Sequence, residues 1–160
     1  MTRQTRRSVL KAAGATAAAM AMPVRASAQG EPIKVGILTP LTGAGGNDGP
    51  RMLKAMQAVF EEVNKAGGVL GRKIETVVED DQTNPEAAVR AARKLIEVNK
   101  VPVIMGTWAS AVTAAVAPVC WESKTFILTV SGADSITLLP HQGFLVRTQP
   151  NSKLQATAHG

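Results

Sequence analysis

Short apolar runs alternate along the chain with stretches in which apolar residues recur every three or four positions. The apolar runs predict five strands, at residues 33–39, 73–81, 101–105, 125–130 and 144–148. The helical spacing predicts a helix after each of the first three strands, and a further helix opens at Pro150 and Asn151. Alternation of strand and helix is typical of an α/β fold with a parallel sheet and helices on both faces.

Two helix boundaries carry clear local signals. Asn84 stands before Pro85, and this order predicts a helix start, because an asparagine side chain can cap a helix and proline has no N–H to leave unpaired at the first helical position. Gly67 and Gly68 follow the first helical stretch and supply the left-handed backbone that often ends a helix. The second helix should therefore begin at Pro85 and the first should end before Gly67.

The first 28 residues have the order of parts of an export signal. Residues 5–11, TRRSVLK, form a twin-arginine motif, the alanine-rich run 12–22 follows, and Ala26-Ser27-Ala28 is a small-residue cleavage site. The apolar run is far shorter than the ~20 residues of a membrane-spanning helix. We expect a twin-arginine signal peptide over residues 1–28 that is cleaved after Ala28, rather than an ordinary amphipathic helix. Residues 29–160 should form the exported part, without a membrane span.

The positive charge of the chain belongs to this leader. The chain has 160 residues, enough for one ordinary domain, and a formal net charge of +6. Residues 1–28 hold five of the 18 basic side chains and no acidic one, which leaves 13 basic against 12 acidic side chains in the remainder. No basic stripe with interleaved aromatic residues remains, so the sequence does not indicate a nucleic-acid partner.

The reactive side chains do not form a recognisable catalytic or metal-binding set. Cys120 lies in an apolar helical stretch and is expected to be a buried, unreactive thiol. His141 and His159 have no partners at metal-ligand spacing. Asp80 and Asp81 end the second strand without a third ligand on that edge, so we expect them to cap and order loops. We therefore expect no enzyme activity, no metal and no cofactor.

A glycine-rich segment after the first strand is superficially similar to a dinucleotide-binding loop. Gly43 and Gly45 begin the pattern G-x-G-x-x-G, but Asp48 occupies the position of the third glycine. Gly43 also comes four positions after the end of the strand at Thr39. We therefore do not expect nucleotide binding.

Open parallel sheets bind ligands at the carboxyl ends of their strands, where neighbouring loops diverge. Here that edge comprises four loops, at residues 41–49, 80–83, 106–110 and 131–135. Three of them are rich in glycine, serine and threonine, which suits close approach of the backbone to a small polar ligand.

The third of these loops contains the strongest candidate site. Gly106 is expected to lead the chain off its strand, and Ser110 is expected to cap the helix that follows. A helix amino terminus with a hydroxyl group is suited to a carboxylate or another anion. Thr107 and Trp108 lie in the same loop, where the indole ring could form an apolar wall. The alternative is that Ser110 only caps its helix and Trp108 only covers the sheet edge.

Five segments resemble a known family: IKVGILTPLTG, EEVNKAGGVLGRKIE, VVEDDQTNPEAAVRAARKLI, VIMGTWASAVTAAVAPV and ILTVSGADSITL, in that order. The resemblance is to the periplasmic solute-binding proteins of ABC importers, type I receptors of the Leu/Ile/Val-binding kind, and covers residues 31–155. It implies two α/β lobes joined by a hinge, of which this sequence supplies most of the first lobe and stops before the hinge. It also implies a periplasmic receptor that delivers an amino acid, or a related small carboxylate or amide, to ABC permease subunits of the inner membrane.

The resemblance further implies roles for individual positions. Ser110 falls where the family holds the α-carboxylate of the ligand, and Ser131 where a backbone carbonyl receives its ammonium group. Ala133 falls where amino-acid receptors commonly have a hydroxyl, and Asp48 where branched-chain receptors often have an aromatic ring. These two departures leave another amino acid, or another small carboxylate or amide, as open as a branched-chain amino acid.

The sequence leaves two other functions open. The same lobe architecture serves the ligand-sensing ectodomains of receptors. Twin-arginine export often carries folded, cofactor-dependent enzymes, although the sequence offers neither a cofactor motif nor a nucleophile–base pair.

Overall fold

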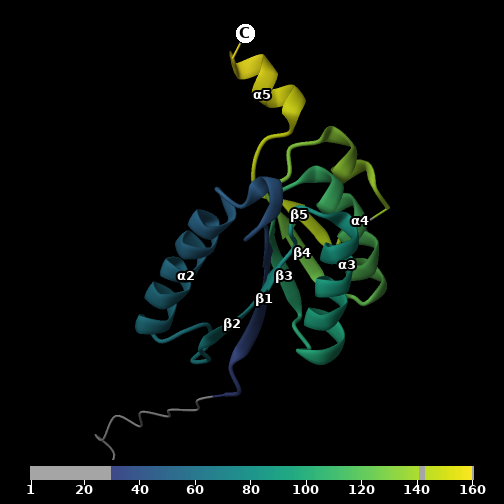
Figure 1. Cartoon of the computed structure of the whole chain (residues 1–160). Coiled ribbons are helices and arrows are strands. Elements are labelled where there is room, and N and C mark those ends of the chain that lie inside the picture. Colours follow the sequence, from purple (N-terminus) through teal and green to yellow (C-terminus); the bar gives the residue numbers. More distant parts are fainter. Residues whose placement is uncertain (1–29, 141–142, 160) are drawn as a thin grey trace, which may run out of the picture.

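The computed structural model describes residues 30–140 and 143–159; the leader, the cleavage predicted after Ala28 and His141 lie outside this range. Five parallel strands form one sheet in the order β2-β1-β3-β4-β5 (Figure 1). The strands are β1 (Ile33–Thr39), β2 (Ile74–Asp80), β3 (Val103–Thr107), β4 (Phe126–Thr129) and β5 (Leu145–Arg147). The predicted fold class is confirmed.

The helices lie on both faces of the sheet, as expected. Helix α2 (Gly49–Lys65) covers one face, and α3 (Pro85–Arg93) and α4 (Ser110–Glu122) cover the other (Figure 1). A π-helical turn, η2 (Lys94–Val98), continues α3, and two short 3₁₀ turns are η1 (Gly43–Gly45) and η3 (Asp134–Leu138). Helix α5 (Ser152–His159) stands clear of the sheet, beyond its carboxyl edge.

The helix boundaries form where the sequence signals them. The Asn84 side chain accepts a hydrogen bond from Ala87 N at 2.9 Å and so caps α3. Gly68 has φ +76° and its N–H donates to Val63 O at 2.8 Å, which closes the end of α2. Both predicted boundaries are confirmed, because each depends on contacts within a few residues.

The main core lies between the sheet and the pair α3 and α4. Fully or nearly buried apolar side chains from the strands meet small and branched residues of the helices: Leu38, Ile104, Ile127 and Leu145 pack with Ala88, Ala92, Leu95, Val112 and Val116. Each large apolar side chain buried in this way contributes about 1.5–3 kcal/mol. Cys120 belongs to the same core, and burial raises the pKa of its thiol to about 12. The thiol is therefore buried and unreactive, as predicted.

Strand β3 differs most from its prediction. It runs from Val103 to Thr107 instead of 101–105, because Val101 N bonds back to Leu95 O at 3.2 Å and thereby closes the preceding helix. Gly106 was expected to lead the chain off the strand; instead it forms a bulge inside β3 with φ +102°. The strands β2, β4 and β5 are each one residue shorter at both ends than predicted.

Candidate functional site

The carboxylate of Asp80 joins the loops that follow β1 and β2. It accepts hydrogen bonds from Leu41 N at 2.9 Å, Thr42 N at 3.2 Å, Thr42 Oγ1 at 2.6 Å and Gln82 N at 2.8 Å. Burial alone would raise the pKa of Asp80, but the bonds from Thr42, Gln82 and Leu41 outweigh burial, and the pKa is lowered. The expectation that Asp80 orders loops is confirmed.

The neighbouring Asp81 is fully buried and serves the same turn. Its Oδ1 accepts a hydrogen bond from Thr83 N at 2.7 Å, while Oδ2 has no partner among the described residues. Burial raises the pKa of Asp81, and the nearby charge of Asp80 raises it further. Within residues 30–140 and 143–159, His, Cys, Asp and Glu side chains form no cluster of three that could hold a metal ion. Their hydrogen bonds to the backbone of these loops make both aspartates loop supports.

The glycine-rich loop after β1 packs against the loop after β2. Gly43 has φ +77°, and a Cβ atom there would lie 2.2 Å from Gln82 O. Thr83 Oγ1 accepts a hydrogen bond from Gly45 N at 2.8 Å. Gln82 and Thr83 themselves have φ values of +55° and +53°. This backbone conformation is strained for residues other than glycine, so contacts with the surrounding structure must hold it in place. Gly43 is needed for this contact between loops.

At the other half of the carboxyl edge, Ser110 is the first residue of α4. The residue that caps the helix is Ala109, which has no side-chain hydrogen bond, so the expectation that Ser110 caps α4 is wrong. The Ser110 hydroxyl instead accepts a hydrogen bond from Ala133 N at 3.2 Å, because the loop after β4 passes over the helix start. The first helical bond of this turn joins Thr113 N to Ala109 O at 3.0 Å. The N–H groups of residues 110–112 are therefore those that a helix leaves without an intrahelical acceptor.

Ser131 lies in a buried cluster of hydroxyl groups beneath this loop. Its Oγ lies 2.5 Å from Thr113 Oγ1 and 2.9 Å from Thr129 Oγ1, and it donates to Trp108 O at 3.0 Å. Thr113 Oγ1 and Thr129 Oγ1 are 3.0 Å apart. The Ser131 hydroxyl thus ties the loop after β4 to the loop after β3. Sequence reasoning missed Thr113 and Thr129, although hydroxyl residues in otherwise apolar segments were a usable signal.

Trp108 lies between the two halves of the edge. Its side chain is 38% exposed, and a Cβ atom on Gly45 would lie 3.1 Å from its Cε3, so the indole ring rests against the loop after β1. Asp48 is exposed at the end of that loop, and its N–H donates to Gly45 O at 2.9 Å. Thr107 was expected in the loop with Trp108, but the β3 bulge keeps Thr107 inside the strand, fully buried.

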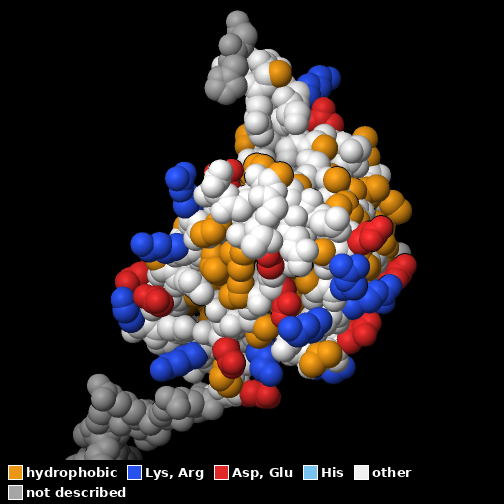
Figure 2. All heavy atoms as spheres, viewed as in Figure 1, with side chains coloured by type: hydrophobic (Ala, Val, Ile, Leu, Met, Phe, Trp, Pro, Cys, Tyr) orange, Lys and Arg blue, Asp and Glu red, His pale blue; other side chains and the backbone are white. Residues whose placement is uncertain are grey.

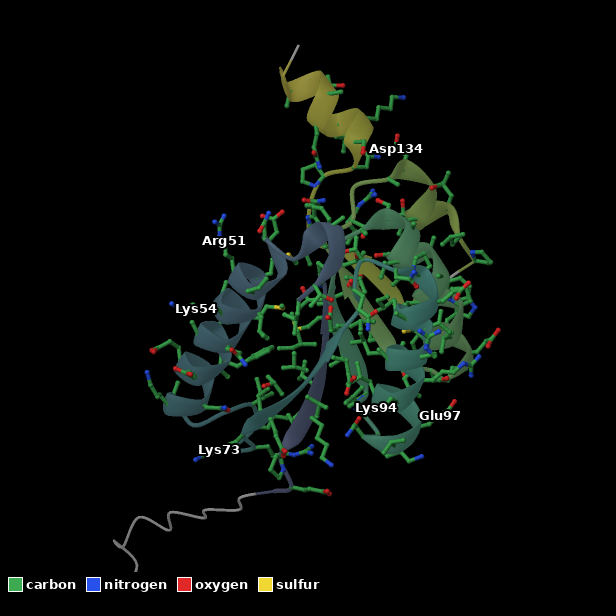
Figure 3. All side chains as sticks on the ribbon, viewed as in Figure 1. Arg51, Lys54, Lys73, Lys94, Glu97 and Asp134 are labelled. Carbon is green, nitrogen blue, oxygen red and sulfur yellow. The ribbon has the colours of Figure 1, made fainter. Side chains whose placement is uncertain are left out.

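The structure thus brings together five of the six predicted site residues at the ends of β3 and β4: Thr107, which is buried and takes part through its carbonyl, and Trp108, Ser110, Ser131 and Ala133. Sequence reasoning missed Arg147, whose Nη1 donates to Ala133 O at 2.9 Å from the end of β5. Figure 3 shows Asp134 at the same edge beside the start of α5, where its carboxylate accepts a hydrogen bond from Lys153 N at 3.3 Å. An arginine at the carboxyl end of an apolar strand was the signal for Arg147.

This geometry suits recognition of a small anion rather than catalysis. Ser110 is half-buried, its hydroxyl lies at the amino terminus of a helix of 13 residues, and the first turn of that helix carries no acidic side chain. A helix amino terminus carries a partial positive charge and unpaired N–H donors, both of which favour a carboxylate. Trp108 adds an exposed ring beside these donors.

Comparison with known proteins identifies the family. Residues 32–160 match the model of the periplasmic binding protein family. The chain belongs to this family. Residues 3–23 match the model of the twin-arginine translocation pathway signal sequence, and the two matches together support an exported, periplasmic protein. No helix within the described residues is both long enough and apolar enough to cross a membrane.

Several relatives carry more specific names. A Leu/Ile/Val-binding protein, BraC3 of Rhizobium johnstonii, is 31% identical over 61% of this chain and 26% of its own. The branched-chain amino acid transporter substrate-binding protein LivJ of Streptococcus pneumoniae, solved with isoleucine, is 25% identical with a TM-score of 0.71 over 75% of this chain and 34% of its own. An ABC-transporter solute-binding protein of Rhodopseudomonas palustris, solved with 3,4-dihydroxybenzoic acid, is 30% identical with a TM-score of 0.66 over 74% of this chain and 32% of its own.

These relatives are binding proteins, so the family supports a binding role over an enzymatic one. The chain spans about a quarter to a third of the length of the relatives just described. The structural matches confirm the fold of the first lobe of a type I periplasmic binding protein.

Proposed function

We propose that this protein is the substrate-binding component of an ABC importer and binds a small solute through the solute's carboxylate group. The observation that carries the proposal is the amino terminus of α4, where the half-buried Ser110 hydroxyl and neighbouring N–H groups form a donor-rich site with no acidic side chain in the first helical turn. Family membership and the twin-arginine signal support delivery of this solute to permease subunits at the inner membrane.

The ligands of two relatives support the carboxylate as the shared feature. Isoleucine in LivJ and 3,4-dihydroxybenzoic acid in the Rhodopseudomonas protein both carry a carboxylate, whereas only isoleucine carries an ammonium group. The finer identity of the solute then depends on what surrounds the carboxylate. Trp108 is the exposed apolar surface beside Ser110, and we assign it contact with the remainder of the ligand.

The other candidate residues have positioning roles in this proposal. The Ser131 hydroxyl is committed to Thr113, Thr129 and Trp108 O, so Ser131 can meet a ligand only through its backbone. Ala133 holds the Ser110 hydroxyl through its N–H and offers no hydroxyl of its own. Asp48, on the loop that Trp108 touches, is the candidate for contact with a polar ligand tail.

The test is calorimetric titration of the protein with isoleucine and with 3,4-dihydroxybenzoate, each paired with its carboxamide. We expect at least one acid to bind and its uncharged amide to bind far more weakly. Ser110→Ala should weaken the acid by about 1–3 kcal/mol, because a hydrogen bond to a charged group is lost. Ser123→Ala, at the opposite end of α4, is the matched control and should leave affinity unchanged.

Thermal melting of both variants separates binding from folding, since Ser110 also bonds Ala133 N. An amide that binds as tightly as its acid, or a folded Ser110→Ala protein with unchanged affinity, would overturn the assignment of the carboxylate to α4. The choice between isoleucine and 3,4-dihydroxybenzoate then decides whether an ammonium group is required.

A further inference from the structure

The sheet edge opposite the candidate site is formed by the loops that lead into the strands, and we call these loops the amino edge. Among the described residues they comprise 30–32, 66–73, 99–102, 123–125, 139–140 and 143–144. Their charged side chains are one acid, Glu31, and four bases: Arg72, Lys73, Lys100 and Lys124. The segments that leave the strands, at 40–48, 81–84, 108–109, 130–133 and 148–151, contain two acids and no base. The two edges of the sheet therefore carry opposite net charge.

The helix ends next to the amino edge do not cancel its positive charge. Glu62 pairs with Lys65 at 2.8 Å, and Glu97 pairs with Arg93 at 3.4 Å. In Figure 2, most of the Lys and Arg side chains in view lie in the lower half of the molecule, toward this edge, with acidic side chains among them. A lysine after a helix is favoured by the helix dipole, but Arg72 and Lys73 follow a hairpin instead.

That hairpin presents an exposed leucine in a strained conformation. Val69 N donates to Arg72 O at 2.8 Å and Arg72 N donates to Val69 O at 3.0 Å, so Leu70 and Gly71 form a two-residue turn. Both have positive φ, +51° and +77°, a conformation that favours Asn, Asp or Gly. Leu70 is nevertheless 94% exposed, and Val69 beside it is 41% exposed. Neither the turn nor burial in the fold accounts for a leucine at this position.

The hairpin is held firmly against the start of β1. A Cβ atom on Gly68 would lie 2.1 Å from Arg72 O, so the two arms of the turn are in close contact. Arg72 Nε donates to Glu31 O at 2.6 Å, and a Cβ atom on Gly30 would lie 3.0 Å from Arg72 Cγ. Leu70 is therefore displayed from a fixed base beside Gly30, where the folded part of the chain begins.

A cavity of about 390 Å³ lies beside this base. Its charged lining consists of three cations, Lys34, Arg72 and Lys100, and the single carboxylate of Glu31. An arginine offers paired N–H donors and a lysine a mobile point charge, and both suit the oxygen atoms of a phosphate group. The cavity lies at the opposite edge of the sheet from Ser110, so it is separate from the candidate solute site.

We propose that the amino edge binds the surface of a bilayer that contains anionic phospholipids. Leu70 enters the layer of head groups, and a lipid phosphate is held by Lys34, Arg72 and Lys100. An apolar tip flanked by basic side chains is the pattern of proteins that lie on anionic membranes. A second copy of the chain is disfavoured, because two such edges would repel each other.

The position of the export signal supports the membrane as the partner. The twin-arginine signal matches residues 3–23, and the chain continues from it to Gly30, which contacts Arg72. The signal is read at the membrane. While the signal is attached, the amino edge is thus the part of the folded chain that is joined most directly to the membrane. Contact of Leu70 and the basic side chains with lipid fits this arrangement.

The test is co-flotation with lipid vesicles. The protein is purified from the periplasm and its amino terminus is determined by mass spectrometry, so that all variants compared have the same one. Vesicles of equal parts phosphatidylcholine and phosphatidylglycerol are compared with vesicles of phosphatidylcholine alone. We expect binding to the anionic vesicles that is about tenfold tighter than to the neutral ones and weakens with added salt.

The contribution of the apolar tip is measured with Leu70→Asn. Asparagine suits a positive φ, so this variant should melt no lower than the parent protein. It should nevertheless bind anionic vesicles about fivefold more weakly, because it has no apolar side chain to insert. Leu138→Asn is the matched control: Leu138 is 82% exposed on η3, outside the amino edge, and its replacement should leave vesicle binding unchanged.

The contribution of charge is measured with the double variant Lys73→Gln, Lys100→Gln. We expect it to weaken binding to anionic vesicles about tenfold, because each basic side chain near an anionic surface strengthens binding severalfold. Arg51→Gln, Lys54→Gln removes the same net charge from α2, and Figure 3 shows these two residues farther from the amino edge than Lys73. This control should bind within about twofold of the parent protein.

Three results would each overturn the proposal. The first is equal binding to anionic and neutral vesicles, or to neither. The second is an equal loss in the two double variants, which would show attraction by net charge alone. The third is unchanged vesicle binding by a folded Leu70→Asn protein. None of these substitutions lies in the candidate solute site, so failure here would leave the proposed solute binding intact.

Discussion

The two halves of the sheet's carboxyl edge are held together by different chemistry. Between β1 and β2, the ionised carboxylate of Asp80 gathers three backbone N–H groups and a hydroxyl. Between β3 and β4, the hydroxyls of Thr113, Thr129 and Ser131 bond to one another and to backbone carbonyls. One half is held by a charge and the other by neutral groups.

This difference distinguishes the half of the edge that supports the loops from the half that we propose binds the ligand. The charge of Asp80 is already matched by donors from its own loops, so that half of the edge requires no further partner. The neutral hydroxyl cluster leaves the partial positive charge at the start of α4 uncompensated. Under the function proposed above, we expect an incoming carboxylate to be attracted to Ser110 and repelled by Asp80.

The largest expected effect tests the packing of the supporting half. Gly43→Ala should destabilise the protein by more than about 3 kcal/mol, because the new Cβ would lie 2.2 Å from Gln82 O at a φ of +77°. Gly67→Ala is the matched control: its φ is +108° but no atom lies within 4 Å of the new Cβ, so strain alone should cost about 1 kcal/mol. Denaturant unfolding measures both, and equal losses would show that the loops are not locked together at Gly43.

The next effect tests whether charge holds that half. Asp80→Asn should lower stability at pH 7 by about 2 kcal/mol, since the donors lose an ionised acceptor. The folded-state pKa of Asp80 lies below its ordinary 3.8, so its stabilisation is present above that value and lost as the pH falls through the folded pKa.

The stability difference between the parent and Asp80→Asn should therefore close on acidification. Asp81 has a raised pKa and the opposite sign, because its ionisation costs stability and protonation relieves that cost, but both proteins contain it. Asp48→Asn is the control, because Asp48 is exposed and makes no side-chain capping bond to α2. A gap independent of pH would mean that the charge of Asp80 is not what matters.

A substitution in the half of the edge between β3 and β4 should lower stability by less, and by the same amount at each pH. Thr113→Val keeps the volume of the side chain but leaves the Ser131 and Thr129 hydroxyls with one partner fewer, at a cost of about 1.5 kcal/mol. Melting at several pH values between about 4 and 8 should give the same loss, because no ionisable group enters the cluster. The exposed Thr137→Val is the control, and a pH-dependent loss in Thr113→Val would undo the contrast between the two halves.

The smallest expected loss of stability concerns an ion pair whose charges are not held by several hydrogen-bond donors. Lys94 Nζ lies 2.6 Å from Glu79 Oε1 and links η2 to β2, but the lysine side chain is 57% exposed. Lys94→Ala should cost about 0.5 kcal/mol, a loss that added salt reduces. A loss as large as that of Asp80→Asn would show that exposed pairs at this sheet contribute as much as the Asp80 carboxylate with its several donors.

Much of the architecture follows from local sequence signals. The alternation of apolar runs and helical stretches predicts the five-stranded parallel sheet, and Asn84 and Gly68 set the boundaries at which α3 begins and α2 ends. The loop-ordering role of Asp80 was also predictable, because an acid at the end of a strand meets the N–H groups of adjacent loops. These features depend on periodicity and on contacts between neighbouring segments.

The details of the candidate site depend on longer-range contacts. Ser110 was expected to cap α4, but Ala133, 23 residues away in the chain, supplies the N–H that its hydroxyl accepts. The bulge at Gly106 moves Thr107 from the expected loop into a buried strand, because β3 must keep its register with β4 on both sides of the extra residue. Arg147 reaches Ala133 only because β5 lies beside β4.

The sequence by itself determined the elements, their order and the edge of the sheet at which a ligand would bind, since these follow from apolar periodicity and from the direction of parallel strands. Only the tertiary structure decided which hydroxyl group faces that edge and which hydroxyl groups form hydrogen bonds inside the protein. It also decided which face of the sheet the described helices cover more fully. Each of those outcomes depends on groups far apart in the chain that compete for the same donor, acceptor or apolar surface. The sequence of one segment does not show which distant groups will compete with it.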